Sequence, residues 1–99
     1  MIGTSAPASA AATYEICAFG KYDIWFELPQ QGAKNRVERG ACATVPLKSS
    51  TSYAKIWGYW NNAPTQKFWV GTGHFNGSAG GFAYAQGTTT SPYLFTNRT

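Results

Sequence analysis

The chain has 99 residues, of which 16% are aromatic and only 12% are charged, and its formal net charge is +4. This length fits a single domain, and so many aromatic residues beside so few charged ones argue against a disordered chain. The longest apolar runs, such as Ile24–Phe26, span only a few residues, so we expect no segment with the about 20 apolar residues that cross a bilayer.

Residues 1–13 are predicted to form a flexible tail outside the folded domain. Ser5 to Thr13 reads SAPASAAAT, a run of small residues like the cleavage region of an export signal, although neither a basic start nor an apolar segment precedes it. We therefore expect an export-signal remnant or a linker, followed by one β domain over residues 14–97.

Alternation of apolar and polar residues recurs along the chain, and glycine or proline interrupts every longer segment. This pattern predicts an all-β fold, a small antiparallel sandwich or barrel of about seven or eight short strands. We expect strands at Tyr14–Phe19, Tyr22–Leu28, Arg36–Arg39, Ala43–Leu47, Tyr53–Trp60, Lys67–Phe75, Phe82–Gln86 and Tyr93–Thr96.

Gly20 and Lys21 separate the first two predicted strands and suggest a tight hairpin, because glycine adopts a positive φ without a steric penalty. The first two strands would then pair antiparallel. Polar, glycine or proline residues mark the other loops, which we place at Pro29–Asn35, Lys48–Ser52, Asn61–Gln66 and Asn76–Gly81.

Cys17 and Cys42 are predicted to form a disulfide, which a small domain in an oxidising compartment can use as a staple. Closing a loop of this length stabilises a fold by about 3.5 kcal/mol in the chain-entropy model. Two free buried thiols are the alternative. We expect no metal and no cofactor, because zinc usually needs four ligands and His74 is the sole histidine.

The acidic residues all fall within the first 38 positions, so the rest of the chain is purely basic in its charged residues. Strands formed from this second part would present a mildly positive face. Ordinary solubility is the simpler explanation of the same charges. The acids are Glu15, Asp23, Glu27 and Glu38.

A candidate binding face follows from the alternation in the fifth and sixth predicted strands. A lysine rarely faces a core, so Lys55 places its neighbours of the same parity outside and leaves Ile56 and Trp60 inside. Lys67 does the same for Trp69 in the next strand. The predicted contact residues are Tyr53, Lys55, Trp57, Tyr59, Asn61, Asn62, Lys67 and Trp69.

If these two strands pair, their indoles form an exposed aromatic patch, which on a small domain marks a partner surface. The alternative is that this face is also covered, as in a barrel whose loops fold over it. Trp25 has the same parity as Asp23 and Glu27 in its predicted strand, so we also expect it on the outer side. It would form a separate contact there or lie across from Arg36 or Arg39.

Catalysis is not expected from these residues. A triad needs a histidine oriented by an acid, and no acid follows Glu38. Carboxylates exposed on one short strand lack the cleft that would raise the pKa of one of them. The glycines form no phosphate-binding motif, and sparse positive charge without a recognisable motif argues against nucleic acid as a partner.

The alanine-rich tail, the TYEIC segment at Thr13–Cys17, the cysteine pair and a second half rich in Gly, Thr and aromatic residues resemble small secreted all-β proteins of Streptomyces and related actinobacteria. Such proteins include inhibitors of extracellular enzymes, antimicrobial proteins and adaptor subunits of secreted toxin particles. The resemblance therefore implies secretion and binding.

Our leading hypothesis is a secreted, non-enzymatic protein-interaction module of the adaptor or inhibitor type, whose partner is another secreted or cell-surface protein. The alternative is a carbohydrate- or cell-wall-binding module that stacks the sugar rings of a polysaccharide on the same tryptophans. A cationic antimicrobial protein is a third hypothesis.

Overall fold

The computed structural model describes residues 12–97, and the regular secondary structure of these residues consists of β-strands alone. The described residues contain no helix that is long and apolar enough to span a membrane. The strands are β1 (Thr13–Ala18), β2 (Ile24–Leu28), β3 (Ala33–Val37), β4 (Cys42–Pro46), β5 (Tyr53–Trp60), β6 (Ala63–His74), β7 (Gly81–Thr88) and β8 (Ser91–Thr96).

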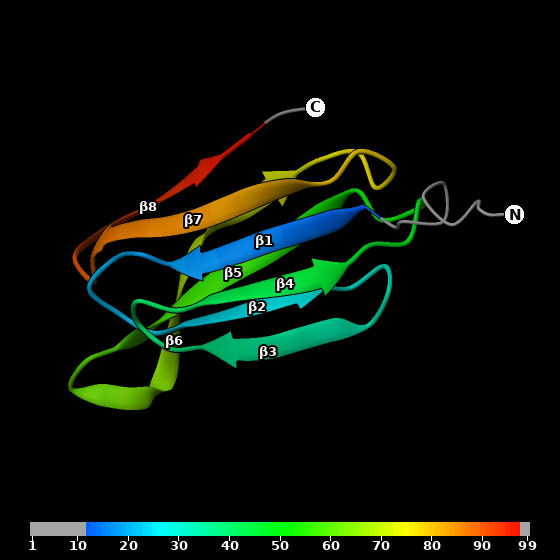
Figure 1. The fold of residues 1–99 in the computed structure, drawn as a ribbon. Coiled ribbons are helices and arrows are strands. Elements are labelled where there is room, and N and C mark those ends of the chain that lie inside the picture. The colour runs from blue at the N-terminus through cyan, green and yellow to red at the C-terminus, as the bar shows by residue number, and fades with distance from the viewer. Residues whose placement is uncertain (1–11, 98–99) are drawn as a thin grey trace, which may run out of the picture.

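The strands form two four-stranded sheets that pack face to face (Figure 1). The order β4-β1-β7-β8 makes the sheet that contains the Cys17–Cys42 disulfide, which we call the disulfide sheet. The order β3-β2-β5-β6 makes the other, which carries all four tryptophans and which we call the tryptophan sheet. Every pairing is antiparallel except that of β1 with β7. The predicted all-β sandwich with one disulfide is confirmed.

The core lies between the sheets and is built by the period of two in each strand. In β2, Ile24, Phe26 and Leu28 are buried while the residues between them are half-exposed. Ala54 and Ile56 of β5 face the same interior. Residues from the disulfide sheet complete the core from the other side, namely Tyr14, Ile16, Ala18, Val45, Ala83 and Ala85.

The predicted hairpin at Gly20 is wrong, because β1 and β2 belong to different sheets. Gly20 does not have a positive φ. A Cβ at this position would lie 2.9 Å from the ring of Tyr22 and from the backbone of Gln86. Glycine is therefore needed here for a close approach where the chain passes from one sheet to the other, and not for a turn.

Two predicted loops are shorter in the structure. β3 already begins at Ala33, within the predicted Pro29–Asn35 loop. Only Asn61 and Asn62 form the turn between β5 and β6, and Pro64 lies inside β6. A proline is tolerated there because β6 is an edge strand. Of the predicted tail, residues 1–11 lie outside the described residues and Thr13 already belongs to β1.

Candidate functional site

The outer face of the tryptophan sheet gathers aromatic and charged side chains from all four of its strands. In β5, Ala54 and Ile56 are fully buried, whereas Lys55 and Trp57, which alternate with them, are half-buried on the outer side. Strand alternation therefore turns every second residue of β5 outward, as the position of Lys55 predicted. We call this surface the tryptophan face.

Three tryptophans form a row across the middle of the tryptophan face. Trp25 of β2 is the register partner of Trp57 in β5, and Trp57 is in turn the partner of Trp69 in β6. The rings of Trp57 and Trp69 meet edge to face, with centroids 5.2 Å apart and planes at 77°. Trp69 ends the row on the edge strand and is 50% exposed. The three indoles are therefore in register across three adjacent strands, and the rings of Trp57 and Trp69 are in direct contact.

Arg36 of β3 lies beside Trp25 at one end of the row, because the two residues are register partners. Its guanidinium donates to Asp23 Oδ2 at 2.8 Å and to the carbonyl oxygen of Pro64 at 3.0 Å. It also lies over the ring of Tyr59, with Cζ 3.9 Å from the ring centroid. Arg36 therefore ties β3, β5 and β6 together on this face.

Asp23 is held in its charged form by its neighbours. The hydrogen bond from Arg36, followed by one from the backbone N–H of Arg39, lowers the pKa of this carboxyl below its ordinary value. A carboxylate with a lowered pKa is a poor general acid near neutral pH. Asp23 serves to orient Arg36.

Glu27 and Lys67 surround Trp25. The indole N–H of Trp25 donates to Glu27 Oε2 at 2.9 Å, and the Lys67 ammonium lies 5.1 Å from the centre of the Trp25 ring. In register, Glu27 stands between Lys34 and Lys55. Within the described residues Lys55 and Lys67 form no salt bridge, so the face keeps a net positive character.

The structure brings the eight predicted contact residues together on β5, β6 and the turn that joins them. Tyr53 lies at one end beside His74, with ring centroids 6.5 Å apart, and Asn61 and Asn62 form the turn at the other end. The amide of Asn61 donates to the Lys21 carbonyl at 3.1 Å. Trp25, predicted as a separate contact or a neighbour of Arg36, lies opposite Arg36 and also joins the tryptophan row.

Two details of the prediction are corrected. Tyr59 was expected to be exposed, but only 8% of its surface is accessible because Arg36 covers its ring. Trp60 was expected in the interior, but it is half-buried, packed at 4.8 Å against Phe68. Phe68 packs in turn against the core and the ring of Tyr22, so Trp60 lies on the predicted side of the sheet and is only less buried than expected.

A second aromatic surface, which sequence reasoning missed, covers the outer face of the disulfide sheet. It comes from β7, β8 and the residue after β1, and we call it the phenyl face: Phe19, Phe82, Tyr84, Tyr93 and Phe95. No charged residue occurs in β7 or β8. In β5 and β6 a lysine indicated which alternate residues face solvent. In β7 and β8 no charged residue gives this indication.

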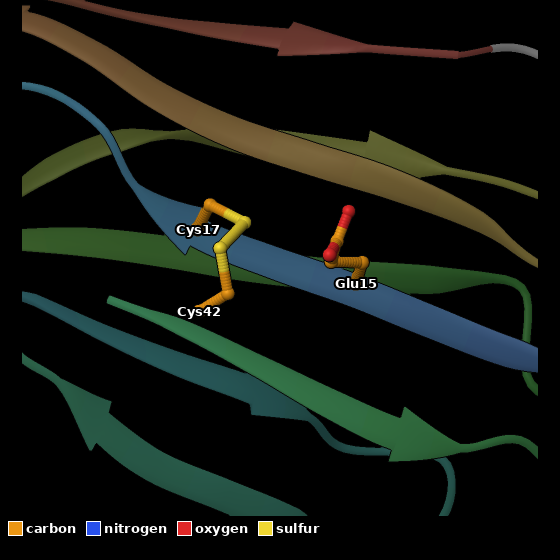
Figure 2. Close-up of side chains that lie close together, drawn as sticks. All are labelled: Glu15, Cys17 and Cys42. Atoms are coloured by element: carbon orange, nitrogen blue, oxygen red, sulfur yellow. A yellow bond between two sulfur atoms is a disulfide. The ribbon is translucent and has the colours of Figure 1, made fainter. Parts of the chain in front are cut away.

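Glu15, Cys17 and Cys42 lie close together beside the phenyl face (Figure 2). Cys17 and Cys42 are register partners on β1 and β4, with Cα atoms 4.0 Å apart, and they form the predicted disulfide. Because each sulfur is bonded to the other, neither is a thiolate that could bind a metal ion. Glu15 Oε1 accepts a hydrogen bond from the Tyr84 hydroxyl at 2.8 Å. The group is therefore a structural cross-link with a hydrogen-bonded carboxylate.

Comparison with known proteins identifies the fold alone. No family model and no curated protein matches the chain. Among solved structures, it is similar to pneumolysin, with a TM-score of 0.58 and 17% identity over 88% of this chain and 23% of that chain. It is also similar to a disulfide-locked mutant of intermedilysin determined with human CD59, with a TM-score of 0.54 and 17% identity over 88% of this chain and 24% of that chain.

The isolated membrane-binding domain of pneumolysin is similar over nearly its whole length, with a TM-score of 0.53 and 16% identity over 88% of this chain and 96% of the domain. The chain therefore spans about a quarter of the matched pneumolysin and intermedilysin chains, and its fold is similar to that of nearly the whole isolated domain.

Proposed function

We propose that this domain is a secreted, non-enzymatic protein-interaction module of the adaptor or inhibitor type, which contacts its partner through the tryptophan face. The observation that carries the proposal is the row of Trp25, Trp57 and Trp69 across three adjacent strands. Tryptophan, tyrosine and arginine supply most of the binding energy in protein interfaces. The row places three such anchors side by side on a rigid sheet.

The surroundings of the row favour a protein partner over a polysaccharide. Sugar rings stack on flat, accessible aromatic faces. The planes of Trp57 and Trp69 lie at 77° to each other, and Lys67 lies over the ring of Trp25. An uneven aromatic ridge flanked by cations suits an apolar pocket with an acidic rim on a protein.

Secretion and the absence of catalysis rest on separate observations. The Cys17–Cys42 disulfide is typical of proteins that fold in an oxidising compartment. On the tryptophan face, Asp23 is paired with Arg36, and Glu27 accepts the indole N–H of Trp25. The hydrogen bond from Arg36 lowers the pKa of Asp23, which is the opposite of what a general acid near neutral pH needs, and the Glu27 carboxylate is occupied by the indole.

The proposal is tested by capture of partners from the culture medium of the producing organism. We expect Trp57→Ala and Trp69→Ala each to weaken binding of the captured protein at least about tenfold, because both remove an anchor from the row. Phe95→Ala, a change of a similarly exposed ring on the opposite sheet, is the matched control and should bind normally. Undiminished capture by both tryptophan variants would reject the tryptophan face as the contact surface.

The same variants distinguish a sugar ligand. If titration with polysaccharides or cell-wall fragments gives a saturable change in tryptophan fluorescence that disappears in Trp57→Ala, the domain is a carbohydrate-binding module and the proposal is wrong. No response to any of these ligands is the result we expect.

A membrane surface is the second candidate, because the similar pneumolysin domain is described as membrane-binding. The cations of the tryptophan face would favour anionic lipids. Co-sedimentation with anionic vesicles that is lost in Trp69→Ala would support this candidate. A protein that stays in solution with both anionic and neutral vesicles would exclude it.

A further inference from the structure

The outer edge of β4 presents unpaired backbone groups. Hydrogen bonds at both ends of the β1–β4 ladder, each 2.9 Å long, run from Ala18 N–H to Ala41 O and from Leu47 N–H to Ala12 O. Hydrogen-bonded pairs alternate along an antiparallel ladder, so every second residue from 41 to 47 faces β1. The N–H and C=O groups of Cys42 and Thr44 therefore point to the open edge, where they have no partner among residues 12–97. Only the Pro46 end is covered, by Gln31, which donates to its carbonyl at 2.8 Å.

The other outer edges in the described part of the chain are protected against pairing with a further strand. β6 contains Pro64, β8 contains Pro92, and these two strands lie against each other along one side of the sandwich. In β3, the N–H of Arg36 donates to the side chain of Asn35 at 2.8 Å and is thus already occupied. Sheets commonly block their edges with proline and charged side chains. The two outward residues of β4 have neither protection.

A groove of about 510 Å³ lies beside this free edge, between residues 35–38 and residues 41–43. Its lining contains no aromatic ring, so it lacks the flat apolar walls that hold a sugar or another small ring. On the β4 side, the short side chains of Ala41, Cys42 and Ala43 allow a second backbone to approach closely. The groove therefore suits an extended polypeptide better than a small molecule.

We propose that an extended, acidic segment of another polypeptide adds to the free edge of β4 as a further strand of the disulfide sheet. A strand presents N–H and C=O groups along one edge at every second residue, about 6.8 Å apart. Cys42 and Thr44 have this spacing and can form four backbone hydrogen bonds with such a segment. This edge is separate from the tryptophan face, so the proposal goes beyond the function proposed above.

The charges on the β3 side of the groove favour an acidic segment. β3 and the turn after it carry three exposed cations, Lys34, Arg36 and Arg39, against one acid, Glu38. Asp23 forms an ion pair with Arg36, and this side still keeps a net positive charge. Pairing of β4 with β4 of a second copy would place the two positive sides opposite each other, which like charges disfavour.

Magnetic resonance of the isotope-labelled protein, titrated with an acetylated and amidated peptide of sequence TVEVEVT, tests the proposal. Valine and threonine favour an extended backbone, and the glutamates supply the negative charge. We expect saturable shifts centred on the amides of Cys42 and Thr44, whose hydrogen exchange should slow at least about fivefold with the peptide well above its Kd. The Ala43 amide already faces β1, so its exchange should change less.

Two substitutions at one position separate backbone from side-chain effects. Thr44→Pro removes an outward N–H and keeps the hydrogen bonds to β1, because proline is tolerated at an edge. It should weaken peptide binding at least about fivefold. Thr44→Val keeps the N–H and is the matched control, which should bind like the wild type. Circular dichroism and thermal unfolding verify that both variants are folded, and the exchange pattern of the wild type decides the matter if the proline variant is not.

The peptide TVQVQVT, which lacks the acids, should bind more weakly than TVEVEVT, and equal affinities would reject the acidic segment. Three further results would overturn the proposal. They are no saturable shift up to roughly 5 mM peptide, which lies in the range of the weakest complexes, equal binding by the two Thr44 variants, and protection of the same amides by self-association of the free protein. None of them bears on capture of a partner by the tryptophan face, so the two proposals fail separately.

Discussion

Tyr14 and Tyr22 are both fully buried, but their hydroxyl groups have different environments. Tyr22 donates to the backbone carbonyl of Gln86 at 2.7 Å and so links the segment before β2 to β7. The Tyr14 hydroxyl has no hydrogen-bond partner among residues 12–97 and lies where Gly73 leaves space by lacking a Cβ. One phenol thus contributes a buried hydrogen bond and the other does not.

This difference predicts opposite effects of removing the two hydroxyls. Tyr22→Phe should lower the free energy of unfolding by about 1 kcal/mol, because the Gln86 carbonyl then loses its donor. Tyr14→Phe should leave the free energy unchanged or raise it slightly, because it removes a buried polar atom without a partner. Urea denaturation of the two variants beside the wild type measures both values, and equal losses would contradict this assignment.

Among the strands, β4 depends most on a covalent link. It is an edge strand of five residues that pairs with β1 alone among the described strands, and the Cys17–Cys42 disulfide joins the two at directly opposed positions. The link restricts a loop with a sequence separation of 25 residues in the unfolded chain. In a domain of this size, such a restriction is a large part of the net stability.

Replacing both cysteines by alanine should therefore lower the free energy of unfolding by about 3.5 kcal/mol. Chemical denaturation of the double variant measures the loss, and reduction of the wild type under the same conditions is the independent comparison. A loss well below about 1 kcal/mol would show that the staple does not limit the unfolded chain as the loop model assumes.

At the scale of the whole molecule, the buried phenols make stability depend on alkaline pH. Burial, with a smaller effect from Tyr93, raises the pKa of Tyr22 to about 12 from its ordinary value of 10.0, and burial raises the pKa of Tyr14 even further. The fold thus favours the neutral, protonated phenols. Their contribution is complete below about pH 10 and is lost as the pH rises through the folded-state values.

We expect the free energy of unfolding to be nearly constant around neutral pH and to fall steeply above about pH 10. Tyr22→Phe should make this fall shallower, because one phenol no longer has to ionise in the core. Denaturant titrations at a series of alkaline pH values provide the measurement. The idea is wrong if the pH profile of the variant superimposes on that of the wild type.

The sequence alone predicted the features that depend on local periodicity. Eight strands and the outward direction of Lys55, Trp57, Lys67 and Trp69 follow from alternation, because side chains of a strand point to opposite faces in turn and a lysine marks the solvent-facing side. The fifth strand was predicted with its observed bounds, Tyr53–Trp60. Each of these inferences needed only a few neighbouring residues.

The tertiary structure alone decided which strands are neighbours. Backbone hydrogen bonds are chemically the same for any pair of strands, so alternation does not show that β1 pairs with β7 and not with β2, or that Trp25 continues the row of Trp57 and Trp69. It also decided the exposure of Phe95 and Tyr93, because β8 has no charged residue to mark its outer side and both faces of the strand are apolar enough to be buried. Packing two sheets around one core settled these choices, since it depends on contacts between residues far apart in the chain.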